Sequence, residues 1–173
     1  MTKLVIVTDA LFYKAIDLYW KWKDLNDSLK EFYTRGVNLH EGITEMICCY
    51  VNDFHLSLGG GSEDAINPKT NELIQVKGSS NWDKDLTSFG PDSKFDCLHF
   101  VRLNSKKDIM YLYDIPTKDL DNIMVNKKFS VRDFKNQGKR PRFSLINKCI
   151  DKYGIEPYAE VDLINRKVKY LQN

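Results

Sequence analysis

The sequence predicts an α/β protein, with a central mixed β-sheet flanked by helices. In two early segments apolar residues recur three or four positions apart, which is the spacing of amphipathic helices. The middle of the chain instead carries short apolar runs bounded by turn-forming residues, as strands do. With 173 residues, 42 % of them hydrophobic and 29 % charged, the chain has the composition of one globular unit, so we expect a single domain over residues 1–173.

The first helix is expected from Asp9 to Tyr33. Thr8 or Asp9 can cap its first turn, and Gly36 lies just past its end. Its apolar positions are Leu11, Phe12, Ala15, Ile16, Tyr19, Trp20, Leu25, Leu29 and Phe32. We expect residues 1–36 to pack on the core or to form a dimer surface.

A second helix is expected from Asn38 to Asn52. Its apolar residues fall within about 120° of arc on a helical wheel, and they are Leu39, Ile43, Met46, Ile47, Tyr50 and Val51. Glu41 and Glu45 lie on the opposite side of the wheel. Asn38 and Glu41 also have the spacing of a capping box, in which the glutamate bonds the amide of the cap residue. This structural role competes with any catalytic role of Glu41.

The remaining elements follow the triple glycine Gly59–Gly61, which ends the helical stretch. Four strands are expected, at Ser62–Ile66, Leu73–Ser79, Phe95–Leu103 and Asp108–Ile115. The turn between the first two strands contains Pro68. The chain then ends in a helix closed by Gly154 and a terminal hairpin, with expected bounds Arg142–Tyr153, Tyr158–Ile164 and Arg166–Leu171.

Cysteine and histidine spacing favours neither a zinc site nor a covalent catalyst. The cysteines Cys48, Cys49, Cys97 and Cys149 form no C-x-x-C pair, and His40, His55 and His99 complete no metal cluster. We expect free, mostly buried thiols, and histidines with surface or packing roles. The first apolar run, Leu4–Val7, is too short for a signal peptide or a membrane span. We therefore expect a cytoplasmic protein without a membrane partner.

Positive charge is concentrated in one part of the chain. The net charge is only +2, but residues 127–142 hold seven Lys or Arg residues against one acid. The rest of the chain is therefore net acidic. A basic block on an acidic protein is typical of a local phosphate-contacting surface, and the alternative is a solvated loop with a chance run of charge.

The pattern that points to chemistry lies in two successive strands. Side chains alternate along a strand, so Asp64 and Ile66 share one face of the first strand, and Gln75 and Lys77 share one face of the second. The short turn brings the two strands side by side. Carboxylate and amide oxygens are hard ligands suited to Mg²⁺, and a lysine beside the metal can stabilise negative charge on a phosphate.

This arrangement resembles the PD-(D/E)xK nuclease core, in which an Asp precedes an acid-x-Lys in the next strand. The corresponding residues here are Asp64, Gln75 and Lys77, and glutamine replaces the second acid. The replacement removes one negative charge from the expected metal site. The resemblance implies that Glu41, on the preceding helix, compensates for it. Glu63 is the other acid nearby, but strand alternation places it on the face opposite Asp64.

Two further segments resemble small type II restriction endonucleases: residues 86–96 (LTSFGPDSKFD) and residues 137–146 (QGKRPRFSLI). Among these enzymes the chain resembles the small family that cuts the interrupted palindrome GC-N-GC. The resemblance implies a homodimer acting on double-stranded DNA, because a two-fold symmetric site calls for a two-fold symmetric reader. It places the catalytic core at residues 38–115 and the DNA-contacting loop and helix at residues 127–154.

Several polar residues are then expected to contact DNA. We assign phosphate contact to Lys127, Lys128 and Lys139. Arg140 and Arg142 can either grip phosphates or bind guanine bidentately, and Ser144 can cap the helix that follows. After this lysine come four more residues expected to face DNA or to form an ordinary polar loop with one packed Trp: Ser79, Ser80, Asn81 and Trp82.

The mechanism expected from these assignments is Mg²⁺-assisted phosphodiester hydrolysis. Asp64 binds the metal together with Gln75 or the main-chain carbonyl of Val76, Glu41 completes the site, and Lys77 orients the attacking water and stabilises the transition state. No small-molecule substrate is expected. The alternatives are a junction-resolving or repair nuclease on the same core, a DNA-binding module that no longer cuts, and an unrelated fold in which the motif is accidental.

Overall fold

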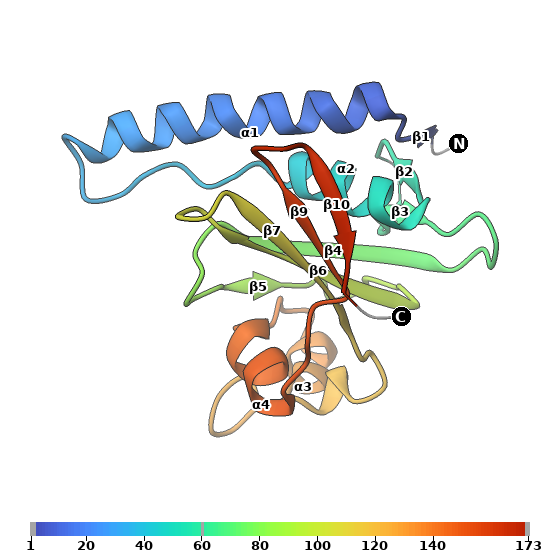
Figure 1. Cartoon of the computed structure of the whole chain (residues 1–173). Coiled ribbons are helices and arrows are strands. Elements are labelled where there is room, and N and C mark those ends of the chain that lie inside the picture. Colours follow the sequence, from blue (N-terminus) through green and yellow to red (C-terminus); the bar gives the residue numbers. More distant parts are fainter. Residues whose placement is uncertain (1–2, 60, 172–173) are drawn as a thin grey trace.

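The computed structural model describes residues 3–59 and 61–171 and is built on one large mixed β-sheet (Figure 1). Its eight strands are ordered β1-β2-β3-β4-β6-β7-β9-β10. Their bounds are β1 Leu4–Ile6, β2 His55–Ser57, β3 Ala65–Ile66, β4 Leu73–Ser79, β6 Cys97–Asn104, β7 Ile109–Ile115, β9 Ala159–Asp162 and β10 Lys167–Tyr170. Strands β4 and β6 pair in parallel and the other neighbouring pairs are antiparallel. The predicted α/β fold with a central mixed sheet flanked by helices is confirmed.

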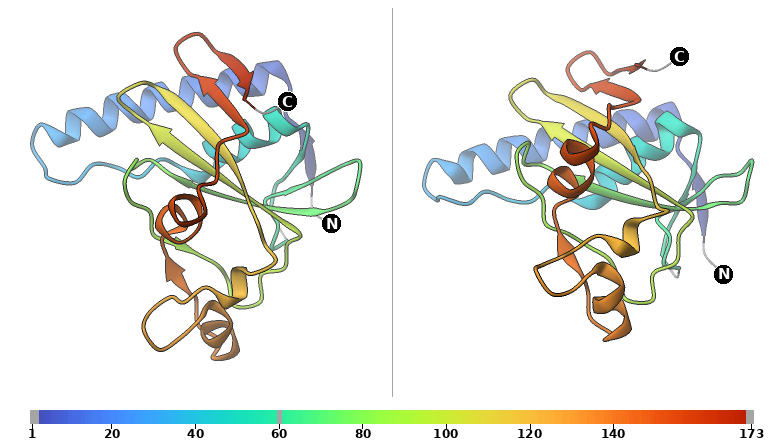
Figure 2. Two further views of the ribbon diagram at one scale, coloured as in Figure 1. Left: turned by 60° about the horizontal axis from the view of Figure 1, so that its bottom comes forward. Right: turned by 90° about the horizontal axis from the view of Figure 1, so that it is seen from below.

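Two layers cover the sheet on opposite sides (Figure 1 and Figure 2). Helices α1 (Asp9–Lys30) and α2 (Glu41–Asn52) pack on one face. The other face is covered by the C-terminal segments, which are the 3-10 turn Leu120–Asn122, α3 Val131–Asn136, the π-helical turn Ile146–Ile150 and α4 Asp151–Tyr153. A small second sheet, in which β5 (Thr87–Ser88) pairs with β8 (Arg142–Phe143), lies in this second layer.

Strand β6 contributes to both cores. Leu98 and Phe100 belong to the core beneath the C-terminal layer, whereas Val101 and Leu103 belong to the core beneath α1 and α2. All four side chains are at most 1 % exposed. A strand covered on both faces is apolar almost throughout, which explains why this strand could be predicted from the sequence.

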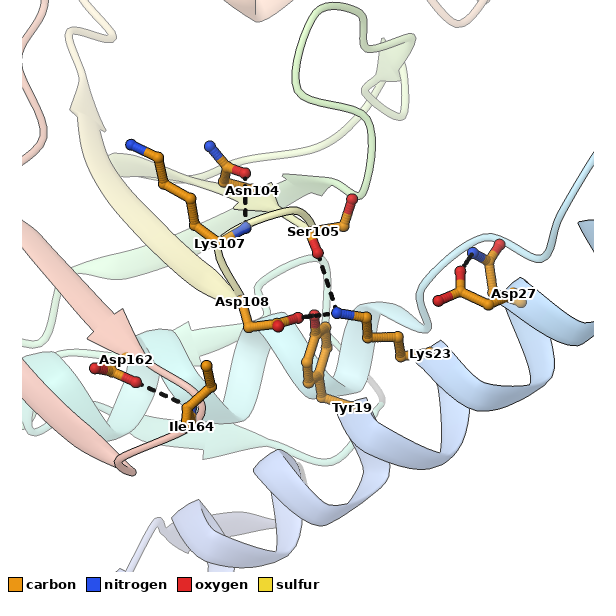
Figure 3. Close-up of polar contacts among 10 residues, drawn as sticks. Tyr19, Lys23, Asp27, Asn104, Ser105, Lys107, Asp108, Asp162 and Ile164 are labelled. Carbon is orange, nitrogen blue, oxygen red and sulfur yellow. Dashed lines mark hydrogen bonds and ion pairs between the residues drawn. The ribbon is translucent and has the colours of Figure 1, made fainter.

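Helix α1 is fastened to the turn between β6 and β7. Lys23 donates to the carboxylate of Asp108 and to the carbonyl of Ser105 (3.1 Å), and the Tyr19 hydroxyl donates to the same carboxylate at 2.5 Å (Figure 3). Burial, together with Asp108, raises the pKa of Tyr19. The C-terminal end of α1 extends past the strands (Figure 1 and Figure 2).

The helix boundaries correct the sequence prediction at two places. Helix α1 ends at Lys30 rather than Tyr33. Helix α2 begins at Glu41 rather than Asn38, because the ring Nδ1 of His40 accepts the Gly42 N–H at 3.0 Å and caps the helix. The predicted capping box between Asn38 and Glu41 is therefore wrong.

The strand of Asp64 is shorter than predicted. Only Ala65–Ile66 form β3 in place of Ser62–Ile66. The Asp64 main chain still bonds to both neighbouring strands: its N–H donates to the Ile74 carbonyl, and its carbonyl accepts the Ser57 N–H, both at 2.9 Å.

The other strands follow the prediction more closely. Strand β4 has the predicted bounds, Leu73–Ser79, and each end of β6, β7, β9 and β10 lies within two residues of its prediction. The short strands β1, β2, β5 and β8 and the helix α3 were not predicted, because elements of two to six residues show too little periodicity. The triple glycine falls partly outside the described residues, at Gly60.

The helix predicted over Arg142–Tyr153 is wrong in its first part. Arg142 and Phe143 form β8, and helical backbone starts only after Ser144. The reason is the carboxylate of Asp85, which accepts the main-chain N–H groups of Leu145 (2.9 Å) and Ile146 (3.1 Å). These are the free amides of the first helical turn, so the helix begins where this acid satisfies them.

The predictions for the cysteines are confirmed for the described residues. Cys48, Cys49 and Cys149 are buried, Cys97 is partly exposed, and all four are free thiols. Over the described part of the chain, no helix is both long and apolar enough to cross a membrane.

Candidate active site

A cavity of about 610 Å³ opens where the start of α2, the middle of β4 and the segment after β4 meet. Its walls carry both signs of charge. The charged residues of the lining are Glu41, Glu45, Asp64, Lys77, Lys84, Asp85 and Arg140. The cavity thus brings together the predicted Asp64, Lys77 and Glu41, which are separated by up to 36 positions in the sequence.

Asp64 is held in place by the neighbouring strand. Its Oδ2 accepts the main-chain N–H of Val76 at 2.8 Å and also accepts the side-chain amide of Gln75. Burial raises the pKa of Asp64, whereas the bonds from Val76 and Gln75 and the positive charge of Lys77 lower it. The carboxylate is thus half-buried and oriented before any ligand arrives.

Gln75 lies behind Asp64. It is 4 % exposed and lies outside the cavity lining. Its side chain donates to the Asp64 carboxylate, so in this arrangement the amide acts as a hydrogen-bond donor. Val76, which was predicted as the alternative main-chain ligand, does line the cavity.

Lys77 projects from β4 into the same cavity. Its ammonium is 5.9 Å from the centroid of the Phe89 ring. Its charge lowers the pKa of both Asp64 and Glu45, which shows that it lies near the two carboxylates. Among the described residues Lys77 has no hydrogen-bond or ion-pair partner, so its ammonium is available to a substrate.

Glu45 is a site residue that the sequence analysis did not assign to chemistry. It is half-buried in the cavity wall, one turn of α2 beyond the exposed Glu41. Burial, then the charges of Asp64 and Glu41, raise the pKa of Glu45 to about 7, against the lowering effect of Lys77. The helical wheel already placed Glu41 and Glu45 on one side of the helix, and that spacing was the signal for it.

Glu63, the other acid considered for this role, does not line the cavity. One of its carboxylate oxygens accepts the Ser57 hydroxyl at 3.4 Å. Its orientation agrees with the strand alternation that placed it opposite Asp64. Among the three acids, Glu41 and Glu45 are therefore the ones that share the cavity with Asp64.

The donor set suits a hard divalent cation. Within the described residues, no three His, Cys, Asp or Glu side chains converge into a closed metal cluster. Mg²⁺ does not require one, because it usually binds one or two carboxylates and fills its remaining positions with water and substrate phosphate oxygens. Asp64 raises the pKa of Glu45, and Glu41 raises the pKa of both, so a cation among these acids would relieve that repulsion.

The predicted DNA-facing residues divide into two groups. Ser79, Ser80, Asn81 and Arg140 line the cavity. The Ser79 hydroxyl also lies within hydrogen-bond distance of the Asn81 and Lys84 carbonyls, at 2.8 and 2.9 Å, and thereby closes the loop after β4. In this loop Asn81 and Lys84 are exposed and Ser80 is half-buried, and all three line the cavity.

The second group lies outside the cavity. The exposed residues of this group are Lys127, Lys128, Lys139 and Arg142. The hydroxyl of Ser144 donates to Asp85 at 2.5 Å and accepts the Asn147 N–H at 3.0 Å, in agreement with the predicted capping role. Its hydrogen bonds are therefore used within the protein.

Comparisons with known proteins agree on one family. The model of a family described as Bsp6I restriction endonuclease matches residues 7–152. The chain is 42 % identical over 166 residues to the type II restriction enzyme Bsp6I of Bacillus sp. (strain RFL6), covering 95 % of each chain. No solved structure matches significantly.

Proposed function

Because the chain belongs to the Bsp6I restriction endonuclease family, we propose that the cavity beside β4 is the catalytic centre of a type II restriction endonuclease. The enzyme is a site-specific endonuclease, and its reaction is the hydrolysis of phosphodiester bonds in double-stranded DNA. The observation that supports this location is the convergence of Asp64, Glu45 and Lys77 on one cavity. Residues 38–115 carry this catalytic core.

The cofactor in this proposal is Mg²⁺. Asp64, Glu45 and the carbonyl of Val76 are the groups that would hold it, with Gln75 orienting Asp64 from behind or turning its amide oxygen toward the ion. When bound, the ion lowers the pKa of a water molecule and offsets the charge that develops on the phosphate. The second carboxylate that Gln75 does not provide comes from α2.

Glu45 suits this second role better than Glu41. Glu45 is half-buried and its pKa responds directly to Asp64, whereas Glu41 is exposed at the first position of α2. Glu41 then acts at the mouth of the cavity, where it favours the cation by its charge. A helical glutamate thus replaces the missing strand acid.

Lys77 has two tasks in the reaction. Its ammonium holds the attacking water or the phosphate oxygen that gains charge, and it is already positioned for this in a partly desolvated cavity. Because Lys77 lies next to the two carboxylates, its charge also lowers the pKa of each, against the raising effect of burial.

DNA is held at the same cavity and beside it. Arg140, Ser80 and Asn81 are the contacts proposed nearest to the cleaved bond. Residues 127–154 supply the outer contacts, through Lys127, Lys128, Lys139 and Arg142. Because the thiols are free and the substrate is DNA, we place the enzyme in the cytoplasm.

The active form in this proposal is a homodimer joined through α1. The apolar positions of one stripe recur every seven residues, at Leu11, Leu18, Leu25 and Phe32. Leu11 and Leu18 pack against the core, whereas Leu25 on α1 is 51 % exposed and Phe32, two residues after the end of the helix, is 80 % exposed. These apolar residues pack on their own chain in the first half of the series and are exposed in the second half. The exposed half is suited to packing against a second copy of the chain.

The experiment is digestion of a long sequenced duplex by the purified protein with Mg²⁺. We expect discrete fragments whose ends define one recognition site, and no fragments with EDTA or with Lys77→Ala. Fragments from Lys77→Ala would overturn the catalytic assignment. Preferential cutting of branched or mismatched DNA would instead favour a junction-resolving or repair nuclease on the same core.

A further inference from the structure

A second cavity, of about 830 Å³, adjoins the first. It lies between the C-terminal half of α1 with the loop that follows, the loop after β4, and the turn between β6 and β7. Asn38, Ser80 and Asn81 line both cavities. The two therefore form one continuous groove that runs from Lys77 toward the end of α1.

The second cavity carries three cations on three separate segments. Lys30 lies at the end of α1, Arg35 in the loop after it and Lys106 in the turn between β6 and β7. Among the described residues none of the three has a hydrogen-bond or ion-pair partner. The two acids of the lining are Asp27 and Asp83, and the first of these already accepts the Asn26 amide at 3.0 Å.

The wall formed by α1 and its loop is fixed in position. The Trp22 indole N–H donates to the Val37 carbonyl at 2.8 Å, and the Val37 N–H donates to Asn26 Oδ1 at 3.1 Å. At Gly36 the loop passes so close to α1 that an added Cβ would lie 2.0 Å from the Asn26 side chain. These contacts hold Arg35 near the cavity.

The other two walls are equally fixed. Arg102 is buried, stacks on the Trp82 ring at 4.0 Å and donates to the Trp82 carbonyl at 2.7 Å, which anchors the loop after β4. The turn that carries Lys106 is tied to α1 through Lys23 and Asp108 (Figure 3). Unpaired cations on rigid walls suit a rigid polyanion, because little ordering is needed on binding.

We propose that this second cavity binds the phosphodiester backbone of the DNA duplex on one flank of the cleaved bond. Lys30, Arg35 and Lys106 contact successive phosphates there, and the shared residues Ser80 and Asn81 lie at the crossing between flank and reaction centre. The proposal rests on the endonuclease function, since the groove is continuous with its catalytic cavity. It adds a phosphate-binding surface that lies outside the basic block of residues 127–142.

The test compares two triple variants in a Lys77→Ala background, so that binding is measured without cleavage. One carries Lys30→Ala, Arg35→Ala and Lys106→Ala. The control carries Lys14→Ala, Lys21→Ala and Lys118→Ala, three exposed cations that line neither cavity. The probe is a duplex of about 40 base pairs that holds the recognition site at its centre, titrated at several salt concentrations.

We expect the triple variant of Lys30, Arg35 and Lys106, the groove variant, to bind the duplex more weakly. The slope of log Kd against log salt concentration should fall by roughly 3 per chain, because each lost phosphate contact removes about 0.9 from the slope. The control should keep the slope of the Lys77→Ala parent. With Lys77 restored, the control triple variant should cleave within about threefold of the unmodified enzyme. A duplex that lacks the flank covered by the groove should bind the groove variant and the Lys77→Ala parent with equal affinity.

An unchanged slope, or the same change in both triple variants, would overturn the groove assignment while leaving the endonuclease function intact. Failure of the unmodified protein to bind or cut any duplex would instead overturn both. The single variant Lys106→Glu guards against a folding artefact, since it alters one exposed side chain. It should weaken binding more than Lys118→Glu, and equal effects of the two would contradict the proposal.

Discussion

Asp64 Oδ2 accepts the main-chain N–H of Val76 at 2.8 Å, one residue before Lys77 on the adjacent strand. This bond joins the predicted metal-binding acid to the predicted catalytic lysine through the backbone of β4. A carboxylate fixed by a main-chain donor keeps its orientation without a metal, so the centre is largely formed before the cation and DNA bind.

The first prediction concerns Lys77. We expect Lys77→Ala to lower the cleavage rate by about 10³-fold or more, because a positioned cation that stabilises transition-state charge typically contributes 10²–10³-fold and here also orients the water. DNA affinity in EDTA should stay within about threefold, since other residues hold the duplex. Single-turnover cleavage and gel-shift assays measure the two quantities. Lys118→Ala is the exposed control, and an equal loss of rate in it would contradict the assignment.

The second prediction is a pH dependence of cation binding that originates at Glu45. Its pKa is raised to about 7, and a carboxylate must lose its proton to bind a cation. Below pH 7 the Mg²⁺ concentration for half-maximal cleavage should therefore rise about tenfold per pH unit, and above pH 8 it should level off. Titration of cleavage with Mg²⁺ from pH 5.5 to 8.5 measures this.

The matched variants for that prediction lie on the same helix. Glu45→Gln should raise the Mg²⁺ requirement at pH 8 and remove its pH dependence below 7. Glu41→Gln, one turn earlier and exposed, should shift the requirement only slightly and keep the pH dependence. If the two variants exchanged these behaviours, Glu41 would be the second acid.

The third prediction is the stability of the metal-free protein. The folded state holds the Glu45 proton up to about pH 7, whereas the unfolded chain loses it near pH 4.5. Unfolding therefore releases a proton between these values, and the free energy of unfolding falls as pH rises through that window. Glu45→Gln should remove this fall in the free energy of unfolding. It should therefore stabilise the metal-free protein at pH 8 by about 1–2 kcal/mol, after allowance for solvent screening. Urea unfolding with EDTA at pH 5 and pH 8 measures it, and equal effects at both pH values would refute it.

The fourth prediction concerns the missing strand acid. Gln75→Glu removes a donor to Asp64 and places a second carboxylate in a position that is 4 % exposed. Without cation we expect a loss of about 2–3 kcal/mol of unfolding free energy at pH 8, because a buried charge lacks a partner. Mg²⁺ should restore much of it and raise the melting temperature more than in the unmodified protein. Gln137→Glu, at an exposed glutamine, should neither destabilise the protein nor increase the effect of Mg²⁺ on its melting temperature. A destabilisation by Gln75→Glu that Mg²⁺ leaves unchanged would argue against a cation beside residue 75.

The sequence predicted the parts of the fold that have strong local periodicity. Helix α1 and strand β4 were found within a few residues because their patterns are long. The π-helical segment was placed wrongly at its start because its first amides bind Asp85, which lies about 60 positions earlier. Such a tertiary cap leaves no trace in the local pattern.

The site likewise has a part that local sequence patterns predict and a part that depends on tertiary packing. Asp64 and Lys77 could be paired from the sequence because a short turn connects their strands. The preference for Glu45 over Glu41 could not be derived, because both lie on one side of the helical wheel. It depends on the depth at which α2 packs on the sheet, and that depth is a tertiary property.

The fifth prediction tests the dimer. The double variant Leu25→Ser, Phe32→Ser removes two exposed apolar side chains, one on α1 and one two residues after its end. We expect light scattering to report twice the 20.2 kDa chain mass for the unmodified protein and a single chain for the variant, because burial of two such side chains is worth about 1.5–3 kcal/mol each. The melting temperature of the variant chain should change little, as neither side chain belongs to its core. Ile164→Ser, at another apolar side chain that is 62 % exposed, is the control and should keep the dimer mass of the unmodified protein. An unmodified protein with the mass of a single chain at micromolar concentration would exclude this interface.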